Sequence, residues 1–139
     1  MEQQKPAFNL ISITTLEAFF KREAAIDQSY ARAKNNLVLN ITKQFENDNI
    51  GVILTVTLNQ ELEGKNLVEM RVTTVGVFKK QGEVPEEAIT NFCDINGPAI
   101  IFPYVREIFS NLSMKGGLQP IVIQPINFVE LSKQEKEKK

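Results

Sequence analysis

The side chains that could carry out covalent or acid–base chemistry are few in this sequence. Its single cysteine, Cys93, would need an adjacent base to become a nucleophile, and the chain contains no histidine. We therefore expect Cys93 to serve as a small buried hydrophobic residue. Glu86 and Glu87 directly follow Pro85, which is typical of a helix start, because carboxylates stabilise the first turn of a helix. The sequence predicts no enzymatic activity.

Metal, phosphate and nucleic-acid sites lack support as well. The available metal ligands are carboxylates, and none is clustered with the spacing of a metal site. Gly116 and Gly117 lack the strand and flanking pattern of a phosphate-binding loop. The net charge is −1, and residues 133–139 mix acids with bases, so no nucleic-acid surface is predicted. We expect neither a metal nor a cofactor.

Length and composition indicate one globular domain. The chain has 139 residues, of which 42% are hydrophobic and 24% are charged, as is ordinary for a soluble protein. One cysteine excludes an internal disulfide and fits a reducing compartment. No apolar run approaches the roughly 18 residues of a membrane span, and no signal peptide opens the sequence. We expect a cytoplasmic protein without direct membrane insertion.

Period-two alternation of apolar and polar residues dominates the first half of the chain. It runs through residues 36–45, 50–62 and 65–78, which are separated by turn-forming clusters at 46–49 and 61–66. Alternation of this kind indicates an antiparallel sheet with one buried and one wetter face. The buried face is expected to hold Leu37, Leu39, Ile41, Ile50, Val52, Leu54, Val56, Leu58, Val68, Met70 and Val72.

The beginning of the chain is less regular. Residues 8–20 are strand-like, but their alternation slips near Ser12, which a β-bulge explains. Residues 21–35 are polar and rich in alanine, and could form either a long crossover loop or a short helix.

Helical spacing replaces alternation in the second half. A short helix begins after Pro85 and is expected to end before Gly97-Pro98. The next helix ends at Gly116 and carries an apolar stripe made of Ile101, Phe102, Val105, Ile108, Phe109 and Leu112. Asn127 and Glu130 have the spacing of a capping box for a last helix. The domain is thus expected to span residues 1–131, followed by a polar, disordered tail at 132–139.

Residues 98–131 combine Phe102-Pro103-Tyr104 followed by Arg106-Glu107, the stop at Gly116, and the turn Pro125-x-Asn127-Phe128. This stretch resembles the core of the SecB family of bacterial export chaperones. Val75-Gly76-Val77-Phe78 resembles the end of that family's fourth strand. The resemblance implies an α+β fold with a four-stranded antiparallel sheet followed by two helices, and assembly as a dimer of dimers.

The resemblance also implies where partners bind. Unfolded or nascent polypeptides would lie in an apolar client groove walled by the crossover, the loop between the helices and the last helix. Its candidate residues are Phe19, Phe20, Ile26, Tyr30, Leu118, Ile121, Ile123, Ile126, Phe128 and Leu131. The candidate residues of the subunit interface are Met70, Val72, Ile101, Phe102, Val105, Phe109 and Leu112.

A third implied site concerns the SecA motor, to which family members deliver cargo through acidic side chains on the outer face of the sheet. Glu17 occupies one such position, and Glu69 is a further candidate. Arg71 and Lys21, however, stand where other acids would be. Reversing the sign of a charge turns attraction into repulsion, so we expect weak or absent motor docking at this site.

These observations together predict an ATP-independent holdase that binds unfolded preproteins and keeps them export-competent. Burial of apolar area contributes about 25 cal/mol per Å² without any sequence requirement, so no nucleotide is needed. Two alternatives stay open. One is a SecB-like chaperone dedicated to the antitoxin of a toxin–antitoxin system, and the other is a homo-oligomeric scaffold without chaperone activity.

Overall fold

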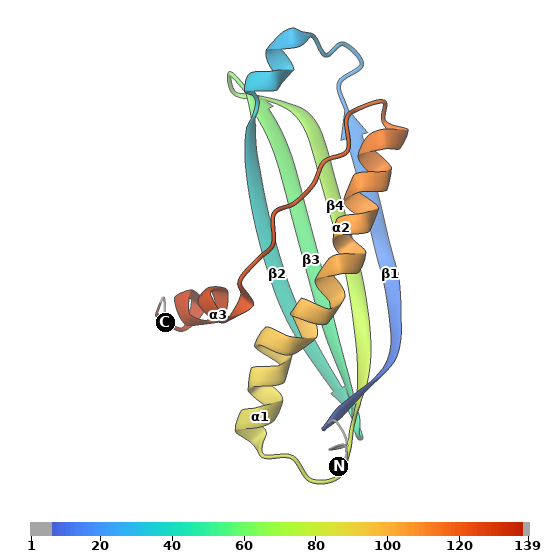
Figure 1. The fold of residues 1–139 in the computed structure, drawn as a ribbon, viewed down its shortest axis with the longest axis vertical. Helices are drawn as coiled ribbons and strands as arrows, with labels where there is room; N and C mark the ends of the chain where they lie inside the picture. Colours follow the sequence, from blue (N-terminus) through green and yellow to red (C-terminus); the bar gives the residue numbers. More distant parts are fainter. Residues whose placement is uncertain (1–6, 138–139) are drawn as a thin grey trace, which may run out of the picture.

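The computed structural model describes residues 7–137, which form one sheet with helices over one of its faces (Figure 1). The elements in chain order are β1 (Phe8–Arg22), η1 (Gln28–Arg32), β2 (Lys34–Glu46), β3 (Asn49–Leu62), β4 (Lys65–Lys80), α1 (Glu86–Asn91), η2 (Phe92–Asn96), α2 (Gly97–Lys115) and α3 (Phe128–Glu137). The four strands pair antiparallel throughout. The predicted α+β fold, with a four-stranded sheet ahead of the helices, is confirmed.

The strands lie in the order β1-β4-β3-β2, so β1 and β2 are the two edges of the sheet. The alternation predicted for the central strands is confirmed, since Val52, Leu54 and Val56 have no exposed surface. Their neighbours in β3, such as Ile53 and Thr55, point the other way and are half-buried. The sheet therefore has a helix-covered face, which carries the core, and an outer face.

The irregularity predicted in the first strand is also confirmed. The register of β1 against β4 shifts once at Ile11 and again at Leu16, as β-bulges do. The side chains of these two extra residues are 58% and 60% exposed. The bulges therefore add apolar surface to an edge strand.

The connection from β1 to β2 passes over one end of the sheet, from one edge to the other (Figure 1). Both possibilities for residues 21–35 hold in part, because β1 extends to Arg22, a loop follows, and η1 forms a short 3₁₀ helix. The Asp27 carboxylate begins this helix by accepting a hydrogen bond from the backbone N–H of Ser29 at 2.8 Å. We call residues 23–33 the crossover.

The helical half is more continuous than the sequence indicates. The expected break before Gly97-Pro98 is wrong, because α1, η2 and α2 follow one another without a gap. The π turn η2 lets the backbone N–H of Gly97 bond to the carbonyl of Phe92, five residues earlier. Pro98 then lies in the first turn of α2, directly after this π turn.

The core lies between α2 and the helix-covered face (Figure 1). Ile101, Val105 and Phe109 of α2 have no exposed surface. Gly76 of β4 permits this close packing, since a β-carbon there would lie 3.0 Å from the Ile101 side chain. α2 is thus fixed against the sheet along the length of its apolar stripe.

The expected interface residues belong mostly to this core. Six of them are buried within the single chain: Met70, Val72, Ile101, Phe102, Val105 and Phe109. Leu112 is half-buried. Apolar spacing shows that a helix face is covered but not whether the covering sheet belongs to another copy. In this chain its own sheet covers the stripe, and a contribution of the six to a subunit interface stays a prediction.

The last helix begins as predicted and ends later. The Asn127 side chain accepts hydrogen bonds from the backbone N–H groups of Val129 and Glu130, both at 3.1 Å. α3 continues to Glu137, so residues 132–137 are helical and not the disordered tail that the sequence predicts. Lysine, glutamine and glutamate dominate this stretch, and all three are good helix formers. Residues 138–139 lie outside the described part.

Candidate functional site

The connection between α2 and α3 runs back over the helix-covered face beside α2 (Figure 1). We call residues 116–127 the interhelix segment. Ser113 fastens its start, because the Ser113 carbonyl accepts the N–H of Leu118 and the Ser113 hydroxyl accepts the N–H of Ile121, each at 2.9 Å. The same hydroxyl donates to the Ser110 carbonyl at 2.9 Å. Ser113 is not among the predicted site residues, because a serine in the last turn of a helix gives no local signal of this role.

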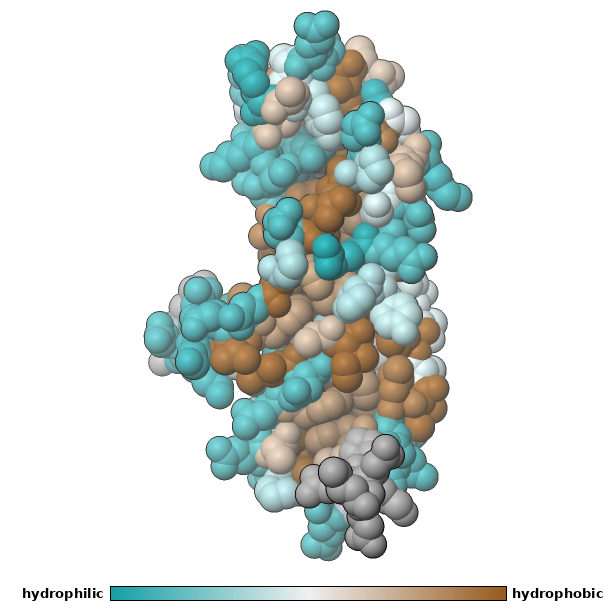
Figure 2. All heavy atoms as spheres, in the orientation of Figure 1, coloured by the Kyte–Doolittle hydropathy of each residue, from teal (hydrophilic) through white to brown (hydrophobic). Residues whose placement is uncertain are grey.

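Apolar side chains of this segment lie partly at the surface. Of the predicted groove residues in this segment and at the start of α3, Ile123 and Phe128 are 6% and 5% exposed. Four others are half-buried: Leu118, Ile121, Ile126 and Leu131. Two further residues, Val122 and Val129, are 60% and 44% exposed and were not predicted. Figure 2 shows that hydrophobic side chains gather on this face between α2 and α3.

A hollow of about 520 Å³ lies between the edge strand β2 and α3. Leu39 and Ile41 of β2 and Leu131 of α3 contribute its apolar lining. Lys43 and Asp94 also line it, and the Lys43 Nζ lies 3.9 Å from the Asp94 Oδ1. The other lining residues are polar or charged as well, so the hollow is mostly polar and carries a strip of three apolar side chains.

The end of β1 and the crossover supply the residues expected at the opposite wall. Phe20, Ile26 and Tyr30 are half-buried and pack against the core. The Tyr30 hydroxyl donates to the Gln60 side chain, which donates in turn to Asn35 Oδ1 at 3.0 Å. Burial raises the pKa of the Tyr30 hydroxyl, so this group stays a protonated donor at neutral pH. The end of the crossover is therefore tied to β3.

Phe19 lies on the outer face, and this corrects its expected place in the groove. Consecutive residues of a strand point to opposite faces, so Phe19 and Phe20 cannot line one wall. The guanidinium carbon of Arg71 lies 5.2 Å from the centre of the Phe19 ring, within the range of a cation–π contact.

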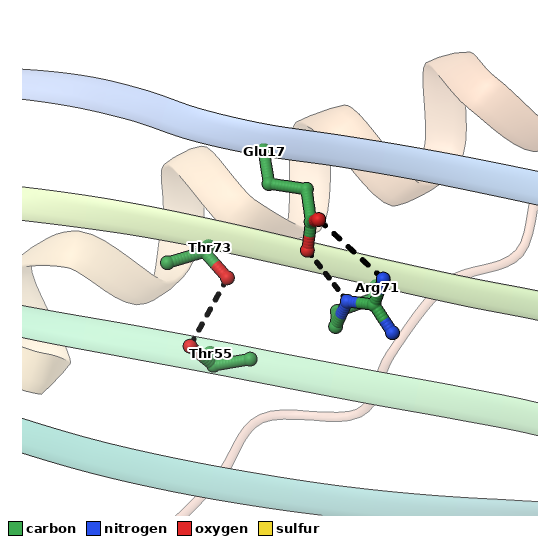
Figure 3. Close-up of polar contacts among 4 residues, drawn as sticks. All are labelled: Glu17, Thr55, Arg71 and Thr73. Carbon is green, nitrogen blue, oxygen red and sulfur yellow. Dashed lines mark hydrogen bonds and ion pairs between the residues drawn. The ribbon is translucent and has the colours of Figure 1, made fainter.

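The outer face carries the residues expected for motor docking, and Figure 3 shows Glu17 and Arg71 facing each other there, beside Thr55 and Thr73. The Arg71 Nε donates to Glu17 Oε1 at 2.5 Å, and Nη2 donates to Oε2 at 3.4 Å. The hydrogen bond from Arg71 holds the pKa of the Glu17 carboxyl below its ordinary value. The acid at this position is thus neutralised by a partner in the same chain.

The second acid of the outer face also has a basic neighbour. Glu69 of β4 pairs in register with Lys21 of β1. Its carboxylate accepts a hydrogen bond from the Asn66 side-chain amide at 3.1 Å. The outer face therefore carries charges of both signs in place of an acidic patch.

The groups considered for other chemistry are inert where they are described. Within residues 7–137, no three His, Cys, Asp or Glu side chains gather as a metal site. Cys93 is buried, as predicted, and this burial raises the pKa of its thiol and disfavours the reactive thiolate. None of the described helices is long and apolar enough to cross a membrane.

Comparison with known proteins gives one consistent family. The model of the family described as preprotein translocase subunit SecB matches residues 2–139. The chain is 29% identical over 140 residues to the protein-export protein SecB of Methylobacillus flagellatus. The alignment covers 98% of this chain and 88% of the relative. It is 35% identical over 126 residues to the protein-export protein SecB of Xanthomonas campestris pv. campestris. That alignment covers 84% of this chain and 74% of the relative.

The fold agrees with a solved structure as well. That structure is a SecB-like chaperone of Mycobacterium tuberculosis in complex with a peptide from the HigA1 antitoxin. The TM-score is 0.76 with 15% sequence identity, over 87% of this chain and 91% of the other. Because the family model spans nearly the whole chain and the sheet and helices follow the same plan, this chain belongs to the SecB family and is a SecB-like chaperone.

Proposed function

We propose that this chain is an ATP-independent holdase that binds unfolded preproteins in the cytoplasm and keeps them competent for export. Clients would lie in a groove between the crossover and the interhelix segment. The observation that carries the proposal is the exposure of Val122, at 60%, on a segment that Ser113 fastens to α2. An apolar side chain held outward on a fixed segment offers a preformed contact for extended polypeptide.

The physical basis of such binding is the burial of apolar area. Each Å² that a client removes from water contributes about 25 cal/mol, whatever the client's sequence. A folded protein hides its apolar segments, whereas an unfolded one exposes several at once. Weak contacts at several copies of the groove in one oligomer then add up to avidity for a long client.

The test is suppression of aggregation. The chain is mixed at stoichiometric amounts with a chemically denatured model protein that is then diluted into buffer, and light scattering is followed over time. We expect scattering to fall without added nucleotide. Unchanged scattering would overturn the holdase proposal and favour the alternative of a scaffold without chaperone activity.

Assembly is a further part of this proposal, because multiple grooves require multiple copies. The outward side of α2 exposes Ile100 and Tyr104 at 40% and 47%, four residues apart on one side of the helix. The edge strand β1 adds the bulged Ile11 and Leu16. We infer that these surfaces, and not the buried stripe, bring copies together as a dimer of dimers.

A substitution in α2 tests the assembly. Tyr104→Lys should lower the mass measured by light scattering, because a charge would be buried in the interface. Gln44→Lys, at an exposed polar position of β2, the edge of the sheet opposite β1, is the matched control. Equal masses for the wild type and both variants would remove this surface from the interface.

The client could also be an antitoxin, the second candidate function. The curated relatives are named protein-export proteins, which supports export. A chain of the same fold holds an antitoxin peptide, and the Glu17–Arg71 pair leaves the outer face without a free acid at that position. Both observations favour the alternative of a chaperone that works without the SecA motor.

Binding to the purified motor separates the two tasks. We expect weak or no binding by the wild type, and tighter, salt-sensitive binding by Arg71→Glu, which converts the pair into two acids. Tight binding of the wild type that is lost in Glu17→Arg would instead establish docking on this face and favour export.

A further inference from the structure

The two segments that wall the proposed groove start at the same place. The crossover begins at Glu23, directly after Arg22 at the end of β1, and the interhelix segment begins at Gly116, directly after α2. Figure 1 shows the end of β1 and the end of α2 at the same end of the sheet. A contact between these two points controls how far apart the walls begin.

The side chain of Arg22 makes that contact. Its Nη1 donates to the carbonyl oxygen of Gly116 at 2.8 Å. Its Nε donates to the carbonyl of Glu23 at 2.9 Å, and its Nη2 donates to the carbonyl of Ala24 at 3.4 Å. A carbonyl at the C-terminus of a helix carries partial negative charge, and its bond to a guanidinium is stronger than one between neutral groups. One side chain therefore holds the first residues of both walls.

The ring of Phe20 completes the contact from the other side. A β-carbon on residue 116 would lie 2.2 Å from Cζ and 2.4 Å from Cε1 of this ring, so only glycine leaves the ring in place. The φ angle of Gly116 is −80°, which any residue can adopt. Glycine is thus required here by the ring and not by the backbone conformation. Gly117, with φ at +78°, then turns the chain away from α2.

We propose that Arg22, Phe20 and Gly116 form a latch that sets the separation of the crossover from the interhelix segment, and with it the width of the client groove at this end. Arg22 and Phe20 are positioning residues in this role, because they act on a client through the walls that they hold. The effect on clients rests on the proposed holdase function, whereas the effect on the two segments does not.

The first test removes the charge of Arg22. In Arg22→Gln, hydrogen exchange of the free protein should become faster in residues 24–33 and 117–126, and affinity for a reduced and alkylated, permanently unfolded protein should fall about tenfold. Lys79→Gln removes one positive charge from an exposed position of β4, outside both walls, and should change neither readout. Exchange and affinity in Arg22→Gln equal to those of the wild type would overturn the latch.

The second test changes the ring contact and decides the matter even if Arg22→Gln fails to fold. Gly116→Ala should speed exchange in both segments and weaken client binding, because the new methyl group displaces the Phe20 ring. Adding Phe20→Leu should restore much of the loss, since the smaller side chain leaves room. Gly116→Ala that behaves as the wild type would refute the proposal.

The latch and the holdase proposal can fail separately. A wild type that binds no unfolded protein, but whose two segments lose protection together in Gly116→Ala and recover in the double variant, overturns the holdase and supports the latch. Client binding by the wild type with no change in any variant supports the holdase and overturns the latch.

Discussion

The helix-covered face and the outer face of the sheet come from alternate residues of the same strands, yet they present different surfaces. On the covered face the apolar residues of the central strands β3 and β4, such as Leu54, are buried. On the outer face, the hydroxyls of Thr55 and Thr73 lie 3.1 Å apart, and Glu17 pairs with Arg71 (Figure 3).

The central strands therefore add little exposed apolar surface on the covered side. Such surface belongs to the interhelix segment, which is laid over the core and keeps Val122 outward, and to the edge strand β2, where Leu37 and Phe45 are 38% and 58% exposed. The comparison shows how one domain can keep a sealed core and an adhesive surface on the same side. The core gives stability, and a separate segment gives binding.

Substitutions of adjacent residues in β3 should show the largest difference between the faces. Leu54→Ala should cost about 2–5 kcal/mol of unfolding free energy, because it leaves a cavity in the core. Ile53→Ala, one residue earlier on the half-buried outer face, should cost about 1 kcal/mol. Urea unfolding followed by circular dichroism measures both. Equal losses would mean that the outer face is covered in solution and would break the comparison.

A second pair compares two valines of almost equal exposure, Val122 at 60% and Val38 at 62%. Val122→Lys should weaken binding of an unfolded client about tenfold, because the client would lose apolar contact and meet a charge. Val38→Lys lies on the outer face of an edge strand, where lysine is tolerated, and should leave client binding unchanged. Fluorescence anisotropy with a labelled unfolded client gives both affinities.

The same pair indicates where clients bind. Equal loss in both variants would place client contacts on both faces, and loss only in Val38→Lys would move the groove to the outer face. Either variant should shift stability by less than about 0.5 kcal/mol, so a change in binding would not reflect unfolding.

The arrangement of the sheet could be predicted from the sequence because burial imposes period two on every strand. The alternation places Val52, Leu54 and Val56 on the correct face. The interruption of the alternation near Ser12 likewise marks the β-bulge at Ile11. The capping residue Asn127 was also correct, since a side-chain cap is a local interaction that needs no knowledge of the rest of the fold.

Other features depend on contacts that spacing does not encode. The stripe through Ile101 and Phe109 had the pattern of a covered helix face, but the pattern carries no information about which chain covers it. A Gly-Pro pair usually ends a helix. Here the helix continues through Gly97-Pro98, because a π turn directly before the pair accommodates it. The bond from Arg22 to Gly116 joins parts that are far apart in the sequence, and the tie from Ser113 to Ile121 spans a loop, so neither follows from a local motif.

The smallest expected effect concerns the pair that neutralises the outer face. The pKa of Glu17 is held below its ordinary value by the hydrogen bond from Arg71. The pair therefore contributes stability that is fully present above the pKa of glutamate in the unfolded chain and is lost as pH falls through the lower folded-state pKa. Glu17→Gln should be slightly less stable than the wild type at neutral pH, and the difference should vanish in acid.

Salt and a matched variant sharpen this prediction. Glu17 and Arg71 are both exposed, so added salt should reduce the difference in the same way as acid. Glu69→Gln is the comparison, because Glu69 faces Lys21 across the strands but accepts its hydrogen bond from the neutral amide of Asn66 and not from Arg71, so its difference should be smaller. Urea unfolding at neutral and acidic pH measures each variant. A difference for Glu17→Gln that grows on acidification would mean that the carboxylate is not stabilised by Arg71, and the outer face would then carry a free acid for a basic partner.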